Sequence, residues 1–261
     1  MTAILNADFY KLKSNVALKV LPLAAVIWSV LTACFMLFVE SGATVQGEFF
    51  SNKDIFGFNP TGALGVRALA TLSNLYSILA VVFAGLFIST EFTQGTIRNA
   101  ICVGVSRMQI YLSKLTVCAA MLALCMFLST AAFIITFTIM YGFGNSAGFL
   151  QETITVFLMQ FLYHFTYTGI SCLLAFLIPN IVITVAAGII VVIFSGLLVE
   201  ICTAFDVLNG IAPFIPQYYV NHLNDELHNP LFLAMSVVAT ITFVVVTVIV
   251  GCSLFRRQDI K

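Results

Sequence analysis

Six long apolar runs constrain this chain more than any other feature of its sequence. They cover residues 20–39, 68–90, 115–141, 154–178, 181–199 and 231–255. A helix needs about 20 mostly apolar residues to cross the hydrocarbon core of a bilayer, and each run is close to that length or longer. The runs are continuously apolar, whereas the strands of a membrane barrel alternate between apolar and polar residues. The sequence therefore predicts an all-α membrane protein, with six transmembrane helices in one domain over residues 1–261.

The basic residues indicate which side of the membrane each segment faces. If both termini are cytoplasmic, nine of the 11 Lys and Arg residues lie in cytoplasmic segments, and only Lys53 and Arg67 lie outside. Cytoplasmic loops of membrane proteins carry an excess of Lys and Arg. The sequence therefore predicts a multi-pass protein of the cell membrane with both termini in the cytosol. The net charge of zero gives no support for binding to nucleic acid.

The segments at residues 1–19 and 200–230 lie outside the runs but contain apolar residues. In the first segment, four apolar residues share one helical face: Leu5, Phe9, Leu12 and Val16. Lysines lie off that face, a pattern typical of a helix in the cytoplasmic membrane interface. The second segment is interrupted by Pro213 and Pro216. We expect it to form short, broken helices on the outer side.

The sequence shows no motif of enzymatic or metal chemistry in the context that such chemistry needs. It contains no phosphate-binding G-x-x-x-x-G-K-[ST] and no zinc-binding H-E-x-x-H. A G-x-S-x-G string occurs at residues 144–148, but it lies in a short glycine-rich loop between two apolar runs and not on the strand-to-helix turn that a nucleophilic serine needs. We therefore expect no catalytic residue, no metal site and no cofactor in this chain. No Asp, Glu, Lys or Arg lies at the centre of a run, which disfavours a proton-coupled transporter. A sodium site built from backbone and hydroxyl oxygens stays open as an alternative.

His164, flanked by Tyr163 and Tyr167, is the one histidine inside an apolar run. These three residues are candidates for lining a transport pathway. The alternative is a neutral histidine that hydrogen-bonds between helices, which the lack of a carboxylate in any run favours. Gly188, Ser195 and Gly196 place small residues on one helical face, which serves either packing within the bundle or a dimer seam.

A polar stretch at residues 91–115 separates the second run from the third and carries four charged residues, three of them basic. Within it, residues 96–103 predict about two helical turns, with Thr93 as the N-cap. The inner, apolar face holds Ile97, Ala100 and Ile101. Arg98 and Asn99 are left to face a partner.

The ordered motif in this stretch resembles that of the ABC-2 type permeases, the membrane subunits of ATP-binding-cassette exporters. It reads E-[FY]-x-x-G-T-[IL]-R followed by G-V-S-R-x-x-[IY]-[YL]-x-[SG]-K. The matching residues are Glu91, Phe92, Gly95, Thr96, Ile97, Arg98, Gly104, Val105, Ser106, Arg107, Tyr111 and Lys114. The amphipathic N-terminus is similar to the family's interfacial elbow helix, and the ending FRRQDIK is similar to its closing pattern.

The resemblance implies that the polar stretch is a cytoplasmic coupling helix that docks into a separate ABC ATPase subunit. It also implies that ATP and Mg bind to that partner, that a second permease chain, identical or homologous, completes the transporter, and that the membrane is a bacterial plasma membrane. The residues it assigns to ATPase coupling are Glu91, Thr93, Gly95, Thr96, Ile97, Arg98, Asn99, Ile101 and Arg107.

The short length of the chain is similar to that of ABC-2 permeases that export peptides. These include lantibiotic and bacitracin self-protection transporters and phenol-soluble-modulin exporters. We therefore expect the exporter to move amphipathic or antimicrobial-type peptides out of the cell or membrane. The 25 Phe residues and the lack of fixed charges in the runs suit such a substrate. The alternatives are export of another hydrophobic small molecule or lipid, and a membrane sensor or scaffold without transport.

Overall fold

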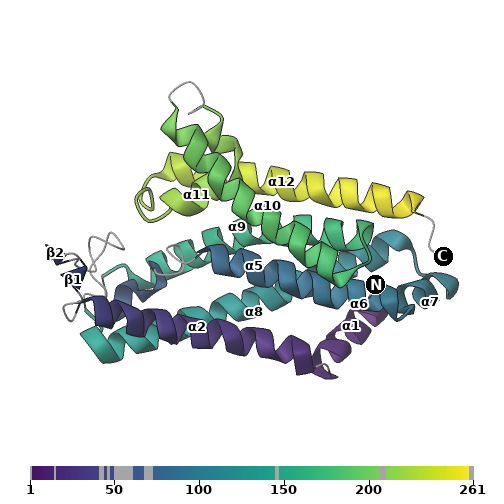
Figure 1. The fold of residues 1–261 in the computed structure, drawn as a ribbon, viewed down its shortest axis with the longest axis horizontal. Helices are drawn as coiled ribbons and strands as arrows, with labels where there is room; N and C mark the ends of the chain where they lie inside the picture. The colour runs from purple at the N-terminus through teal and green to yellow at the C-terminus, as the bar shows by residue number, and fades with distance from the viewer. Residues whose placement is uncertain are drawn as a thin grey trace.

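The structure is a computed structural model that describes residues 2–14, 16–40, 44–45, 48–49, 61–67, 73–144, 147–205 and 210–258. Most of these residues are helical, and the long helices lie alongside one another in an elongated bundle (Figure 1). The strands described, β1 (Thr44–Val45) and β2 (Glu48–Phe49), form one antiparallel pair of two residues each. The predicted all-α membrane class is confirmed.

The long helical segments correspond in position to the apolar runs. They are α2 (Val16–Glu40), α5 (Ser73–Ala84) continued by the π-helical turn η2 (Gly85–Ser89) and α6 (Thr90–Thr93), α8 (Arg107–Tyr141), α9 (Phe149–Leu177), α10 (Ile181–Ala204) and α12 (Pro230–Arg257). Within the described residues, four stretches are long and apolar enough to cross a membrane: Asn74–Thr93, Arg107–Tyr141, Ile181–Ala204 and Pro230–Arg257. The number of six spans stays a prediction.

Short polar turns begin the long helices at defined residues. Ser106 caps α8 by accepting a hydrogen bond from the Gln109 backbone N–H at 3.3 Å. Asn180 caps α10 in the same way through Ile183, and Asn229 caps α12, whose first residue is Pro230. Such side chains satisfy backbone N–H groups that have no partner within the helix. The starts of these helices are therefore set by local sequence.

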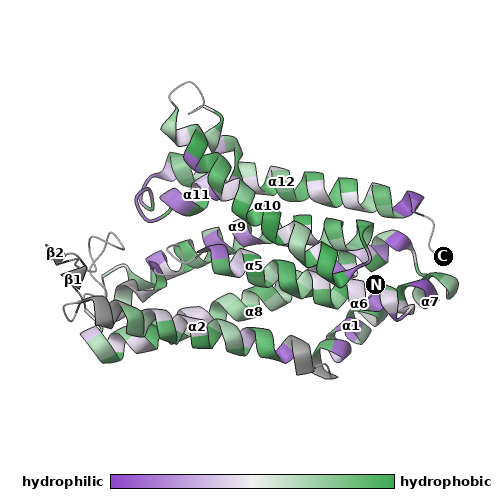
Figure 2. Cartoon of the chain, in the orientation of Figure 1, coloured by the Kyte–Doolittle hydropathy of each residue, from purple (hydrophilic) through white to green (hydrophobic). Residues whose placement is uncertain are grey.

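Helix α9 lies at the centre of the bundle and packs against α5, α8, α10 and α12, while α2 packs on α8. In the most apolar 18-residue segment of α10, 17% is buried inside the structure, and the same value holds for α12. The corresponding segment of Asn74–Thr93 is 61% buried. Both α10 and α12 consist mostly of hydrophobic residues (Figure 2), and several of these are exposed, among them Val182, Ile190, Val238 and Ile249. Helices α10 and α12 therefore expose apolar surface that lipid or a second membrane protein can cover.

The small residues of α10 serve packing within the bundle at two of their three positions. A Cβ at Gly188 would lie 2.5 Å from Val81 Cγ1, so this glycine allows α10 to approach α5 closely. The Ser195 hydroxyl lies 2.8 Å from that of Tyr167 on α9. Among the described residues, and leaving aside the backbone of α10 itself, no heavy atom lies within 4 Å of where a Cβ of Gly196 would stand. The packing alternative therefore accounts for Gly188 and Ser195.

The two ends of the bundle carry different short elements. The start of α1 (Thr2–Ser14), α7 (Thr96–Cys102) and the end of α12 lie together at one end (Figure 1). At the other end lie β1, β2 and α11 (Pro216–His222). Two further short helices are η1 (Gly62–Arg67) and η3 (Ala212–Phe214). The short helices η3 and α11 occupy the segment where the prolines predict broken helices, although residues 206–209 lie outside the described part.

Candidate functional site

Helix α7 is a short helix that two glycines set apart from its neighbours. Gly95, immediately before it, has φ of 69°, and Gly104, just after it, has φ of 94°. Glycine adopts these left-handed conformations at little cost, which lets the chain turn sharply at both positions. The structure therefore presents residues 96–102 as a helical protrusion between α6 and α8.

The predicted N-cap of this helix at Thr93 is wrong. The residue before the helix is Gly95, which supplies no side-chain cap. The Thr93 hydroxyl instead donates a hydrogen bond to the Thr90 carbonyl, at 2.8 Å, within the last turn of α6. The left-handed turn at Gly95 lets α7 begin directly after α6, so Thr93 belongs to the helix before it.

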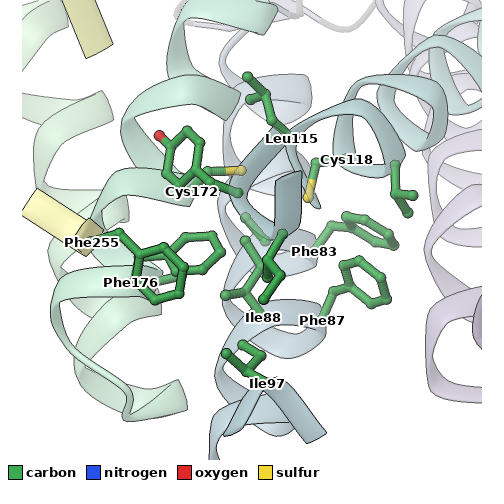
Figure 3. Packing of buried hydrophobic residues seen from close by; sticks show 14 of the residues in the cluster. Phe83, Phe87, Ile88, Ile97, Leu115, Cys118, Cys172, Phe176 and Phe255 are labelled. Atoms are coloured by element: carbon green, nitrogen blue, oxygen red, sulfur yellow. The ribbon is translucent and has the colours of Figure 1, made fainter. Parts of the chain in front are cut away.

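The inner face of α7 is fixed to the bundle by apolar contacts. Ile97 is 1% exposed and points into a cluster that includes Ile88, Phe176 and Phe255 (Figure 3). Ala100 and Ile101 are half-buried against the same cluster, which draws on α5, η2, α8, α9 and α12. The structure thus brings the three expected inner residues together, and it ties α7 to several long helices.

The outer face of α7 is polar and exposed. Arg98 and Asn99 both lie on it, as their spacing from Ile97 requires. Cys102 and Val103, at the end of the helix, are also exposed. The face is therefore accessible to a partner, while the opposite face holds the helix in place.

Behind α7, a cluster of buried charges surrounds the ammonium group of Lys114. Lys114 Nζ lies 2.7 Å from Glu91 Oε1 and 2.5 Å from Asp8 Oδ1. Lys11 Nζ lies 3.2 Å from the same Glu91 oxygen. Asp8 and Lys114 are each 2% exposed and Glu91 is 6% exposed. Buried charges are costly unless they are paired, and here each carboxylate contacts at least one ammonium group.

The cluster also reaches the first residue of α7. The Thr96 hydroxyl lies 3.3 Å from Glu91 Oε2 and 3.1 Å from the Glu91 carbonyl oxygen, to which it donates. Glu91 therefore connects the end of the span formed by α5, η2 and α6 to the start of α7. Among the residues described, no group of three or more His, Cys, Asp or Glu side chains is placed to hold a metal ion.

The sequence pattern missed Asp8, although a signal was present. Leu5, Asp8 and Leu12 lie at i, i+3 and i+7, so they share one face of α1. That face packs against the bundle, and Phe9, which the pattern placed on it, is 43% exposed instead. The side chain of Val16 lies outside the described residues. A carboxylate on the buried face of an amphipathic helix predicts a basic partner, which is Lys114.

Arg107 contacts the end of the last helix rather than an exposed surface. Its Nη1 donates to the carbonyl oxygens of Phe255, Arg256 and Gln258, at 2.9, 3.0 and 2.5 Å. The last carbonyls of a helix have no partner within it and carry partial negative charge, so a guanidinium stabilises them. Arg107 thus links the turn after α7 to α12. Its partners follow about 150 residues later, beyond the reach of local sequence patterns.

The three candidate pathway residues are buried among the spans. His164 is fully buried, with Nδ1 2.9 Å from Ser77 Oγ and Nε2 3.0 Å from Gln160 Oε1. Because an amide oxygen can only accept, Nε2 carries the proton and Nδ1 accepts from the Ser77 hydroxyl. This arrangement is a neutral histidine bonded between α5 and α9. Tyr163 and Tyr167 are also buried, and a pathway role for the three stays a prediction.

The fold and this site define a multi-helix membrane protein with a short helix, exposed on one face, at one end of the bundle. The family described as ABC-2 family transporter protein matches residues 4–196, which is more than half of the chain. The chain therefore belongs to the ABC-2 transporter family. It is an integral membrane protein, the transmembrane component of an ABC transporter whose ATPase is a separate subunit. A search of curated proteins found no match.

Proposed function

We propose that this chain is the membrane subunit of an ATP-driven exporter and that α7 is the helix on which the ATPase subunit docks. The observation that carries the proposal is the two-sided character of α7. Its inner residue Ile97 is fixed in the core, while Arg98 and Asn99 are exposed. A docking helix needs both properties, because it must be reachable by the partner and firmly joined to the parts that it moves.

ATP and Mg bind to the partner in this proposal, and hydrolysis occurs there. The residues of this chain receive the motion: Ile97 through apolar packing, Glu91 through Lys114, and Arg107 through α12. A partner can shift a conformational equilibrium only if it contacts the two states differently. The ATPase would therefore favour one arrangement of the spans when it closes on ATP, and the other after hydrolysis.

The complete transporter would contain two permease chains, identical or homologous, in a bacterial plasma membrane with both termini in the cytosol. The exposed apolar surfaces of α10 and α12 support this proposal, because a second chain could pack against them. The distribution of Lys and Arg supports the orientation, because basic residues favour the cytoplasmic side. The end that carries α7 would then face the cytosol, where the ATPase subunits are.

The substrate would be an amphipathic or antimicrobial-type peptide, so that the transporter confers resistance to such peptides. Two observations support an apolar substrate. The ion pairs among the described residues involve Asp8, Lys11, Arg67, Glu91, Lys114, Glu152 and His228, which lie at or beyond the ends of the apolar runs. The spans offer Phe, Tyr and Met side chains instead, so binding would rest on apolar area. Another hydrophobic small molecule or a lipid would fit the same surface.

The docking proposal is tested by purifying the tagged protein from its native host in mild detergent and identifying what accompanies it. We expect a near-stoichiometric soluble ATPase that is lost from the Arg98→Glu variant. Lys19→Glu serves as the matched control, because it reverses the charge of an exposed basic residue on a different helix, α2. This variant should retain the ATPase. A permease that purifies alone, or an Arg98→Glu variant that retains its ATPase, would contradict the proposal and favour the scaffold or ion-coupled alternatives.

A further inference from the structure

Helix α1 lies behind α7 and is separated from it by a small cleft of about 240 Å³. The cleft is lined from three sides, by Ile4 and Asp8 of α1, Thr96 and Ala100 of α7, and Ile110 and Lys114 of α8. Helix α1 also packs against α8 and α2. The N-terminal helix is therefore part of the structure that supports α7, in addition to any contact that it makes with the membrane surface.

Asp8 is attached to α8 at two points. Its Oδ2 accepts a hydrogen bond from the Ser113 hydroxyl at 2.7 Å, and its Oδ1 lies 2.5 Å from Lys114 Nζ. Two bonds from one carboxylate to neighbouring residues fix the rotation of α1 about its axis as well as its distance from α8. The same ammonium group lies 4.7 Å from the centre of the Phe87 ring, so its position is defined on that side too.

Lys114 passes this constraint on to α7. Its ammonium group contacts Asp8 on α1 and Glu91 at the end of α6, and Glu91 in turn contacts Thr96, the first residue of α7. The four residues thus form one continuous chain of polar contacts from the N-terminal helix to the docking helix. The two contacts of Lys114 are buried, so solvent screens them little, and the contact between Glu91 and Thr96 is partly buried.

We propose that Asp8 is a positioning residue for α7: through Lys114 and Glu91 it fastens α1 to the docking helix, so that the two helices move as one unit when the ATPase changes state. This inference rests on the proposed function of α7 as the docking helix. Asp8 acts through Lys114 and does not itself contact the ATPase.

The balance of charges in the cluster predicts which variants are informative. Asp8 and Glu91 carry two negative charges, and Lys11 and Lys114 carry two positive charges. Removing Lys114 leaves both carboxylates with the half-exposed Lys11, whereas removing Asp8 leaves Lys114 paired with Glu91. Asp8→Asn therefore removes the buried ion pair between α1 and Lys114 without leaving an unpaired buried charge, and only the half-exposed Lys11 still pairs α1 with Glu91. Lys114→Met is the harsher change, and Asp8→Asn should partly rescue it.

The fastening is tested by the distance between spin labels on α1 and α7. Tyr10→Cys provides the first site, because Tyr10 is 73% exposed, and the exposed Cys102 provides the second; Cys34 and Cys252 are replaced by Ser. In the otherwise unaltered permease we expect a narrow distance distribution that is unchanged when ATP and vanadate are added to the complex with its ATPase. In Asp8→Asn, the distribution should widen in the permease alone, and should shift with ATP and vanadate in the complex.

Two comparisons show whether a widened distribution reflects Asp8 itself. Asp8→Glu keeps the charge and should restore a narrow distribution, while Asn6→Ala changes an exposed position on the same helix and should have no effect. A distribution that stays narrow in Asp8→Asn, or one that shifts with nucleotide when Asp8 is intact, would overturn the inference. Failure of the docking proposal has a different signature: the ATPase would remain bound to Arg98→Glu, whatever the label distance in the permease alone.

Discussion

The two ends of the bundle use the same kind of ion pair in different surroundings. At the end that carries α7, Lys114 contacts Asp8 and Glu91, and these side chains are between 2% and 7% exposed. At the opposite end, Arg67 Nη2 lies 3.1 Å from Glu152 Oε2, and both side chains are about one-fifth exposed. His228, 3.8 Å from Glu152, is 78% exposed.

This difference in burial separates a fully buried connection from a partly exposed one. A buried ion pair cannot be broken without leaving an unpaired charge away from water, so it holds its elements in one arrangement. A pair that water can partly reach, such as Arg67 with Glu152, loses less when it is broken, because water can take the place of the missing partner. The α7 end is therefore built to transmit displacement, whereas the opposite end can change its contacts more freely. The predictions that follow test this contrast.

The largest effect is expected from Lys114→Met. This change leaves Asp8 and Glu91 buried with insufficient positive charge, and should lower the free energy of unfolding by about 3–5 kcal/mol. The loss of stability is measured by heating the protein in detergent and using size-exclusion chromatography to determine how much remains folded. The double variant Asp8→Asn/Lys114→Met should recover part of it. A single variant as stable as the wild type would show that the buried cluster does not hold the α7 end together.

The apolar anchor of α7 should come next. Ile97→Ala removes a buried side chain and should cost about 2–5 kcal/mol of packing, concentrated in the attachment of α7. Proteolysis of the 91–107 segment and retention of the ATPase measure that attachment. Ile139→Ala, the same change at a position of α8 that is 79% exposed, is the matched control and should change neither. Equal behaviour of the two variants would contradict the anchoring role of Ile97.

Arg107→Gln should have an intermediate effect. It removes charge-assisted hydrogen bonds to three carbonyl oxygens at the end of α12, at a cost of about 1–3 kcal/mol. Exposed Arg98→Gln should change stability by less than about 0.5 kcal/mol. The stabilities of the two variants are compared by recording their unfolding transitions under the same conditions. A similar result for both arginines would mean that the link from α7 to α12 has no energetic importance.

The smallest effect is expected at the opposite end. Glu152→Gln breaks the pair with Arg67 and should cost no more than about 1 kcal/mol. Unfolding at low and at high salt tests this, because an accessible pair is screened by salt and the difference from wild type should shrink. If Glu152→Gln were as destabilising as Lys114→Met, the contrast between the two ends would be wrong.

Local patterns in the sequence predicted a large part of this structure. The spacing of Ile97, Ala100 and Ile101 predicted a helix over residues 96–103, and the structure has it at Thr96–Cys102. It also predicted the exposed side of that helix, because residues three and four apart share a face. These features depend on neighbours within a few residues, so a single sequence contains them.

The polar contacts that hold α7 in place were not predicted from the sequence. Asp8 and Lys114 are 106 residues apart, and Arg107 lies 148 to 151 residues from the carbonyls that it binds. Only the packing of the whole chain decides these partners. The error at Thr93 has a local cause: capping preference favoured a threonine, but Gly95, in a left-handed conformation, occupies the position before Thr96, and Thr93 belongs to the preceding helix α6.

The measurement that tests the central claim most directly is the rate at which a maleimide labels Cys102 in membrane vesicles. Cys102 is exposed at the end of α7, and Cys34 and Cys252 are replaced by Ser so that the remaining cysteines are buried. If α7 is the docking helix, labelling should slow strongly when the ATPase subunit is bound, and should return to its initial rate when the ATPase is stripped off or when Arg98→Glu prevents docking. Labelling at the same rate with and without the bound ATPase would contradict the account.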